Sequence, residues 1–120
     1  MTFNEIKNLL SDISDPVQKL EMVMDLGDNI LRVPQSALCT EIYGCSSFVE
    51  ICRDGNNFYG HADSKLVRGI LVIILSLVDG KTPTEIKKTD LRNEFTNLNL
   101  HLGASRLNGV NSMLGFLENL

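Results

Sequence analysis

One long apolar run constrains the fold of this chain more than any other feature. It extends from Leu66 to Val78 and reads LVRGILVIILSLV. A run of this length exceeds a typical β-strand and predicts a helix. Because apolar residues occupy nearly every side of that helix, we expect it to pack on more than one face, as the central helix of the domain. The stretch from Gly69 to Val78 is about half of the roughly 20 residues that a membrane-spanning helix needs, so it predicts a buried core segment.

Helix start signals precede this run. Thr2 and Glu5 form a capping box, which predicts a first helix that ends near Ser11. Pro16 follows Ser14 and Asp15, either of which can cap a second helix that ends near Gly27 or Ile30. The apolar face expected for the second helix consists of Val17, Leu20, Val23, Met24 and Leu26.

Similar signals follow the run. Thr82, Pro83 and Glu85 repeat the cap and first-position proline, and they predict a short helix. The segment from Lys87 to Leu100 is weakly patterned, and a final amphipathic helix is expected from Ala104 to Leu120. Its expected apolar positions are Leu107, Val110, Leu114 and Leu117.

The segment between the second helix and the apolar run predicts short strands. After a connection from Arg32 to Ala37, Ile42 and Tyr43 indicate strand structure, and Phe48–Cys52 and Phe58–Ala62 flank a turn cluster at residues 54–57. The predicted elements are therefore segregated along the chain, with helices first, strands next and helices last. This order favours one α+β domain over residues 1–120, with a small antiparallel β-sheet packed against several helices.

Charge and composition exclude several partners. Eleven basic and fifteen acidic residues give a net charge of −4, and the basic residues form no cluster. We therefore expect neither nucleic acid nor an acidic membrane surface as a partner. The first ten residues lack the basic start and uninterrupted apolar stretch of a secretory signal, so the expected location is cytoplasmic.

The cysteines are the candidate reactive groups, since the sequence has no Gly-rich phosphate loop and no closely spaced pair of cysteines or histidines. Cys39, Cys45 and Cys52 are an odd number, so at least one thiol is free, which fits a reducing compartment. Cys45 lies between Gly44 and Ser46, small residues that leave its sulfur approachable, whereas Cys52 ends an apolar run and is expected in the core. The alternative for Cys45 is a buried, inert thiol.

Four segments together resemble the SufE family of sulfur-acceptor proteins. The segment IYGCSSFV, from Ile42 to Val49, is similar to the active-cysteine segment of that family. Asp63 to Gly69, Asp79 to Ile86 and Ser105 to Gly109 resemble the later family blocks, in the same order and at compatible spacing. In this chain Gly103 and Ala104 stand where the family commonly has Ser or Thr followed by Pro, so the last helix is expected to be less firmly capped.

The resemblance implies a sulfur carrier rather than an enzyme in its own right. A cysteine desulfurase that uses pyridoxal phosphate would pass persulfide sulfur to Cys45, for delivery to an iron-sulfur assembly scaffold. The chain itself would then need no cofactor and no metal. Arg106 is a supporting candidate that could lower the pKa of Cys45 or orient its loop, and Asp63 is either a helix cap or a contact to the partner.

Two other classes of function stay open from the sequence. In an iron-sulfur or zinc scaffold, at least two of the three cysteines would converge with His61. In a plain interaction module, Cys45 would be inert. Thiol reactivity separates the module from the other two classes.

Overall fold

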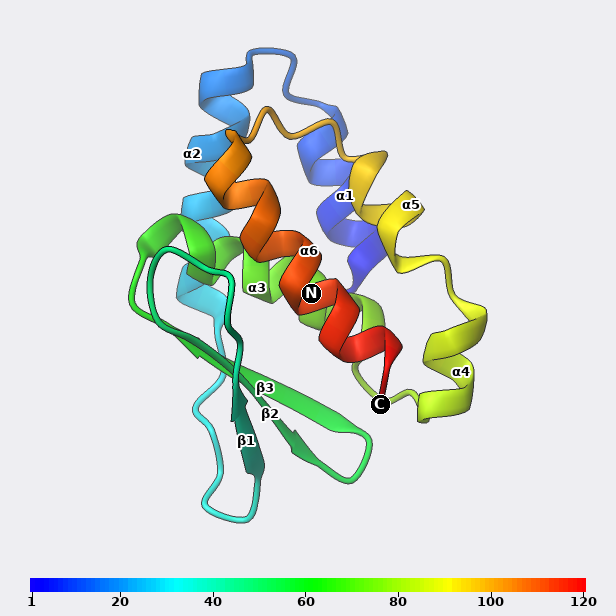
Figure 1. The fold of residues 1–120 in the computed structure, drawn as a ribbon. Helices are drawn as coiled ribbons and strands as arrows, with labels where there is room; N and C mark the ends of the chain where they lie inside the picture. Colours follow the sequence, from blue (N-terminus) through cyan, green and yellow to red (C-terminus); the bar gives the residue numbers. More distant parts are fainter.

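The computed structural model describes residues 1–120 and shows a three-stranded antiparallel sheet with six α-helices (Figure 1). The expected α+β class is confirmed. In chain order the elements are α1 (Phe3–Ser11), α2 (Pro16–Leu26), a 3₁₀ turn η1 (Gly27–Asn29), β1 (Leu38–Glu41), β2 (Val49–Asp54), β3 (Asn57–Ala62), α3 (Lys65–Val78), α4 (Pro83–Lys88), α5 (Leu91–Thr96) and α6 (Ala104–Glu118).

Helix α3 is the central element, as the apolar run predicts. It lies between the sheet, which it contacts through β3, and the helices α1, α2 and α6 (Figure 1). Leu71 and Ile74 are fully buried in this helix. Gly69 allows the close approach of α2, because a side chain there would overlap the backbone carbonyl of Val23. No helix in the fold has both the length and the apolar character needed to cross a membrane.

The sheet has the order β1-β2-β3. A two-residue turn at Gly55 and Asn56 joins β2 to β3, and Gly55 takes a φ of 62°, which favours glycine. The first strand differs from the expectation: it is Leu38–Glu41, whereas Ile42 and Tyr43 lie just beyond its end. All four residues of β1 are exposed. Backbone pairing to β2 defines this strand, so the hydrophobic pattern contains no signal for it.

Local capping explains most helix boundaries. Both predicted capping boxes are present, at Thr2 with Glu5 and at Thr82 with Glu85. Ser64 caps α3 by accepting a hydrogen bond from the Val67 backbone N–H. The N-cap of α6 is Gly103, which provides no side-chain hydrogen bond, in line with the weaker cap expected there.

Two residues expected on buried helix faces are exposed instead. Val17 is 63% exposed at the start of α2, where Val23 and Leu26 are the buried residues. Leu107 is 43% exposed, although it has helical spacing with Val110 and Leu114. Helical periodicity defines a face, but it does not determine whether another element covers that face at a given residue.

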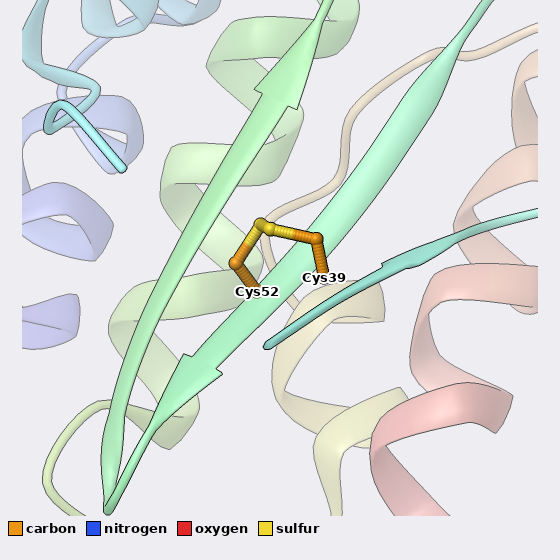
Figure 2. Close-up of a disulfide and its surroundings, with 2 residues drawn as sticks. All are labelled: Cys39 and Cys52. Atoms are coloured by element: carbon orange, nitrogen blue, oxygen red, sulfur yellow. A yellow bond between two sulfur atoms is a disulfide. The ribbon is translucent and has the colours of Figure 1, made fainter. Parts of the chain in front are cut away.

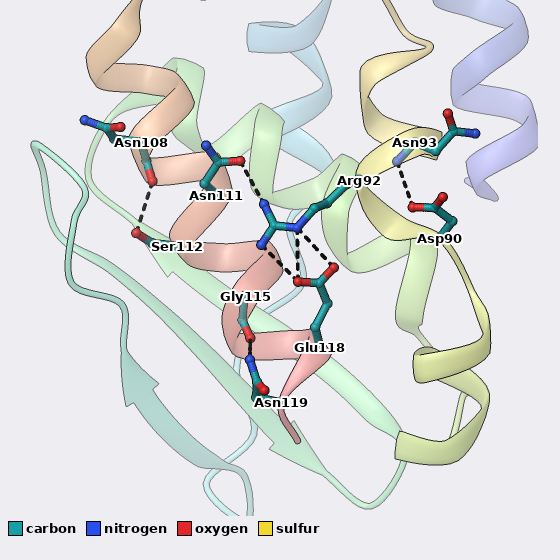
Figure 3. A network of polar contacts seen from close by, with 9 residues as sticks. All are labelled: Asp90, Arg92, Asn93, Asn108, Asn111, Ser112, Gly115, Glu118 and Asn119. Carbon is teal, nitrogen blue, oxygen red and sulfur yellow. Dashed lines mark hydrogen bonds and ion pairs between the residues drawn. The ribbon is translucent and has the colours of Figure 1, made fainter.

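A polar network fixes α6 against α5 (Figure 3). The Arg92 guanidinium donates to both carboxylate oxygens of Glu118, with N–O distances between 2.9 and 3.1 Å, and to the side-chain oxygen of Asn111 at 3.0 Å. Bidentate geometry of this kind is more specific than a single surface ion pair. Helix α6 therefore has a defined position, which matters because it forms one wall of the site described next.

Candidate functional site

Cys45 lies in the connection between β1 and β2. The backbone ladder continues one pair beyond β1, because the N–H of Ile42 donates to the carbonyl of Val49 at 2.8 Å. Residues 43–48 then form a loop that extends from the end of the sheet alongside α6 (Figure 1). Cys45 is the only free cysteine of the chain.

The Cys45 side chain rests on a glycine of α6. Its Sγ lies 3.8 Å from the carbonyl oxygen of Gly109. A Cβ at Gly109 would be 3.1 Å from that sulfur, so the absence of a side chain leaves the room that the thiol occupies. The thiol lines a small cavity of about 10 Å³. The other residues around this cavity are Ser46, Val67, Ile70, Ser105, Arg106, Gly109 and Met113.

A second glycine completes the fit between loop and helix. Gly44 has a φ of 97°, in the left-handed region that side chains disfavour. A Cβ at Gly44 would also collide with the hydroxyl of Ser112. That hydroxyl donates to the carbonyl of Asn108 at 3.0 Å and is thereby held in place (Figure 3). Gly44 and Gly109 thus allow backbone and thiol to approach α6 closely from opposite sides of the interface.

Partial burial controls the acidity of the thiol. Removal from water raises the pKa of Cys45, because desolvation disfavours the charged thiolate. Arg106 lines the same cavity, but no charged group offsets this effect on the pKa. The structure therefore places Arg106 beside the thiol, but Arg106 does not lower the pKa of Cys45 as the sequence analysis considered. The sulfur is also less exposed than its small neighbours in the sequence predict.

Exposed apolar side chains lie at both ends of the loop and on the adjacent helix α6. Tyr43 is 78% exposed, and Phe48, at the other end of the loop, also reaches the surface. The exposed Leu107 follows Arg106 on α6. Inside the loop, the Ser47 hydroxyl is buried and has no hydrogen-bond partner. An unpartnered buried hydroxyl loses free energy relative to water, so Ser47 contributes no polar bond to this conformation of the loop.

Asp63 lies at the base of the same loop. Its backbone N–H donates to the carbonyl of Phe48 at 3.3 Å, and its carboxylate lies 3.5 Å from Nε2 of His61. Both side chains are exposed, so this pair contributes little to stability. The expected capping role belongs to Ser64 and not to Asp63. The His61 ring also packs at a tilt against Phe48, with 5.8 Å between the ring centres.

The other two cysteines form a disulfide, which the sequence reasoning missed (Figure 2). Cys39 and Cys52 lie opposite each other on β1 and β2, and the carboxylate of Glu50 is near both sulfurs. Neither Cys45 nor His61 belongs to this group. The four ligands considered for an iron-sulfur or zinc site are therefore not brought together.

Sequence reasoning also missed the residues that receive the thiol. The resemblance to the family includes Gly109 only as part of a sequence block, and it does not extend to Ser112 or Met113. A signal existed: Arg106, Gly109 and Met113 have helical spacing and so share one face of α6. The function of this face depends on its contact with the Cys45 loop, and the pattern of one helix does not predict a contact with a distant segment.

Together these features define a small α+β domain with one free, partly shielded loop thiol. The SufE family model, described as an Fe-S metabolism associated domain, matches residues 4–120, and the chain belongs to this family.

Two curated relatives are similar to the chain over most of its length. An uncharacterized SufE-like protein of Rhizobium meliloti (strain 1021) is 31% identical over 104 residues, which cover 77% of this chain and 74% of that protein. The sulfur acceptor protein CsdE of Escherichia coli (strain K12) is 28% identical over 122 residues, which cover 94% of this chain and 83% of that protein.

The fold also has a solved counterpart. A solution structure of a hypothetical protein from Thermus thermophilus superposes with a TM-score of 0.70 and 14% sequence identity. The match covers 99% of this chain and 94% of that one. At this identity the likeness concerns the fold.

Proposed function

We propose that the chain is a sulfur carrier whose Cys45 accepts persulfide sulfur from a cysteine desulfurase and delivers it for iron-sulfur cluster assembly. The observation that carries this proposal is one free thiol on a loop that packs on α6 through Gly109. Membership of the SufE family and similarity to a protein named as a sulfur acceptor support it.

The proposed step is an exchange at sulfur. The thiolate of Cys45 attacks the terminal sulfur of the persulfide held by the desulfurase. A new S–S bond forms on Cys45, the old S–S bond breaks, and the desulfurase cysteine leaves as a thiolate. That cysteine is then free for another turnover, so the acceptor stimulates the desulfurase. The chain needs no cofactor for this step, because pyridoxal phosphate belongs to the desulfurase.

The resting site protects the sulfur instead of activating it. Burial raises the pKa of Cys45, and the cavity at its side is only about 10 Å³. Attack on a partner's persulfide therefore requires the loop to leave α6, which exposes the thiol and removes the cause of the raised pKa. Return of the loop then shields the persulfide from water and thiols. The Ser47 hydroxyl has no polar bond to break when the loop leaves, and the contact that is lost is the weak hydrogen bond from the Cys45 thiol to the Gly109 carbonyl.

The desulfurase would dock on the surface around the loop. Tyr43, Phe48 and Leu107 provide exposed apolar contacts, which are common at the centres of protein interfaces. Arg106 and Asp63 add one charge of each sign beside the thiol and at the loop base. We assign them to partner recognition and loop orientation. Sulfur then passes to a downstream iron-sulfur scaffold.

Sulfur mapping tests the proposal. The chain is incubated with a cysteine desulfurase and L-cysteine, and added sulfur is located by mass spectrometry of peptides. We expect one extra sulfur on Cys45 and none on Cys45→Ser. That variant should still bind the desulfurase with similar affinity, because recognition extends over a surface far larger than one side chain. The control Cys39→Ser should keep most of the acceptance. A persulfide on Cys45→Ser would overturn the assignment.

A further inference from the structure

The disulfide joins β1 to β2, the two strands that flank the Cys45 loop (Figure 2). Cys39 pairs with Cys52 in the register of β1 and β2, three residues outward from the closing pair of Ile42 and Val49. Ile42 and Val49 form a hydrogen-bonded pair, and hydrogen-bonded and non-hydrogen-bonded pairs alternate along an antiparallel ladder. Three positions further along, the two cysteines are therefore a non-hydrogen-bonded pair, in which side chains approach most closely. Their Cα atoms are 3.9 Å apart.

The two sulfurs differ in access. Cys52 has 0% exposure, whereas Cys39 belongs to a strand whose residues are all exposed. We therefore expect a thiol from outside to attack the disulfide at Cys39 and not at Cys52. Glu50 lies on the same face of β2 as Cys52, and its carboxylate is within 4.8 Å of both sulfurs. The carboxylate therefore places one acidic group beside the disulfide.

Little else holds β1 on the domain. Its four residues bury no side chain, and Leu38 is 82% exposed. The strand has backbone pairing to β2 on one edge and solvent on the other. Apart from this ladder, three attachments fix the first arm of the Cys45 loop: the covalent bond from Cys39 to Cys52, the hydrogen bond from the Ser36 hydroxyl to the Asp54 carboxylate at 2.7 Å, and the buried side chain of Ile42.

We propose that the Cys39–Cys52 pair is a reversible thiol–disulfide exchange site that controls how freely the Cys45 loop leaves α6. Its substrates are dithiol reductants and, in the opposite direction, small disulfides such as glutathione disulfide. A reductant thiolate attacks the Cys39 sulfur, the S–S bond breaks, and Cys52 leaves as a thiolate that takes up a proton. The second thiol of the reductant then attacks the mixed disulfide and releases Cys39 as a thiol. Two electrons pass to the protein, and the reductant becomes a disulfide.

The consequence for the loop follows from its attachment points. With the disulfide closed, β1 stays on β2, and only residues 43–48 can move away from α6. After reduction, the ladder of β1 can open and residues 38–41 gain freedom, so that the buried side chain of Ile42 is the remaining anchor between β1 and Cys45. The reduced form therefore exposes the Cys45 thiol more often. The link from this exposure to sulfur transfer rests on the function proposed above, but the exchange chemistry itself does not.

Thiol labelling tests the exchange site without any desulfurase. Cys45→Ser protein is equilibrated in glutathione buffers with an increasing ratio of thiol to disulfide. Free thiols are then labelled with maleimide under denaturing conditions, and the number of labels is measured by mass spectrometry. We expect two populations, with no label or two labels, that interconvert reversibly while the protein stays folded by circular dichroism. A pair that keeps two free thiols at every buffer ratio would overturn the proposal, and so would a pair that reduces only when the protein unfolds.

The effect on the loop is measured in the wild-type chain. We expect alkylation of Cys45 by iodoacetamide, followed on its own peptide, to become several-fold faster after reduction, together with faster amide exchange in residues 38–48. Cys39→Ser should behave like the reduced protein under oxidising conditions. Thr40→Ala, on the same strand but outside the disulfide, should behave like the oxidised wild type. Equal Cys45 alkylation rates in the oxidised and reduced forms would disprove loop control, even if Cys45 still accepts sulfur.

Discussion

The sulfur of Cys45 lies 3.8 Å from the carbonyl oxygen of Gly109, a residue 64 positions away in the sequence. This contact joins the loop between β1 and β2 to helix α6, and it exists because position 109 has no side chain. The site of the thiol is therefore formed jointly by the Cys45 loop and helix α6, which are distant in the sequence. Substitutions on α6 should change the behaviour of the thiol without touching the loop.

Gly109→Ala is the most direct of these substitutions. The added methyl would stand 3.1 Å from the sulfur, so the loop must shift away from α6. We expect alkylation of Cys45 by iodoacetamide to become several-fold faster. Alanine favours the helix by up to about 1 kcal/mol, which offsets part of the lost packing, so the free energy of unfolding should change by less than about 1 kcal/mol.

Gly115→Ala is the matched control on the same helix. A Cβ at position 115 would meet only Arg92, at 3.7 Å, which is ordinary contact. This variant should alkylate at the wild-type rate. If both alanine variants react equally fast, the gap at Gly109 does not control the thiol.

The pH dependence of Cys45 alkylation should reflect its burial. Because the pKa of Cys45 is raised, the thiolate fraction at neutral pH is lower than in an unfolded peptide, where the pKa is about 8.5. The rate should rise with pH to a midpoint above that value, and unfolding in urea should return the midpoint to it. Since desolvation is the cause, Arg106→Gln should leave the midpoint unchanged. A midpoint below the peptide value, raised by Arg106→Gln, would show that the guanidinium dominates instead.

Gly44→Ala should release the loop by a different route. The new side chain would occupy a backbone φ of 97° and collide with the Ser112 hydroxyl. Gly80→Ala provides the matched control, since Gly80 has a φ of 80° and open space around it. Both variants incur the left-handed backbone penalty of about 1–2 kcal/mol. Only Gly44→Ala should speed Cys45 alkylation, and equal rates in the two variants would count against docking on Ser112.

The sequence predicts what local patterns determine. Capping residues such as Thr2 and Thr82 act within one helical turn, so both capping boxes were predicted and found. The apolar run of α3 predicted a buried central helix, because burial on all sides leaves a compositional trace. Strand β1 was misplaced because it buries nothing, and backbone pairing alone leaves little trace in composition.

The site was predicted only in part for a related reason. The position of Cys45 on a loop follows from the small residues around it and from the resemblance to the SufE family. Its contact with Gly109 is a long-range relationship. The Cys39–Cys52 disulfide depends on the strand register, which follows from the position of β1 at Leu38–Glu41.

Leu71 tests the core that holds both parts of the site. It is fully buried in α3, and it packs so closely on Gly60 of β3 that a side chain there would overlap it. Leu71→Ala should lower the free energy of unfolding by about 2–5 kcal/mol through lost burial and the cavity left behind. Leu38→Ala, at a position 82% exposed, should change it by less than about 0.5 kcal/mol. Urea denaturation measures both, and similar losses in the two variants would contradict the described core.

Reduction of Cys39–Cys52 should lower the stability of the whole domain. The disulfide closes a loop with a sequence separation of 13 residues, and cross-linking a loop of about this length in the unfolded chain is worth about 3 kcal/mol. For a domain of this size, that loss lowers Tm by on the order of 10 °C. Cys45→Ser should show the same drop on reduction, because Cys45 takes no part in the bond. Cys39→Ser should show none, since it starts without the disulfide. A Tm that falls equally on reduction in Cys39→Ser would mean that the reductant acts elsewhere.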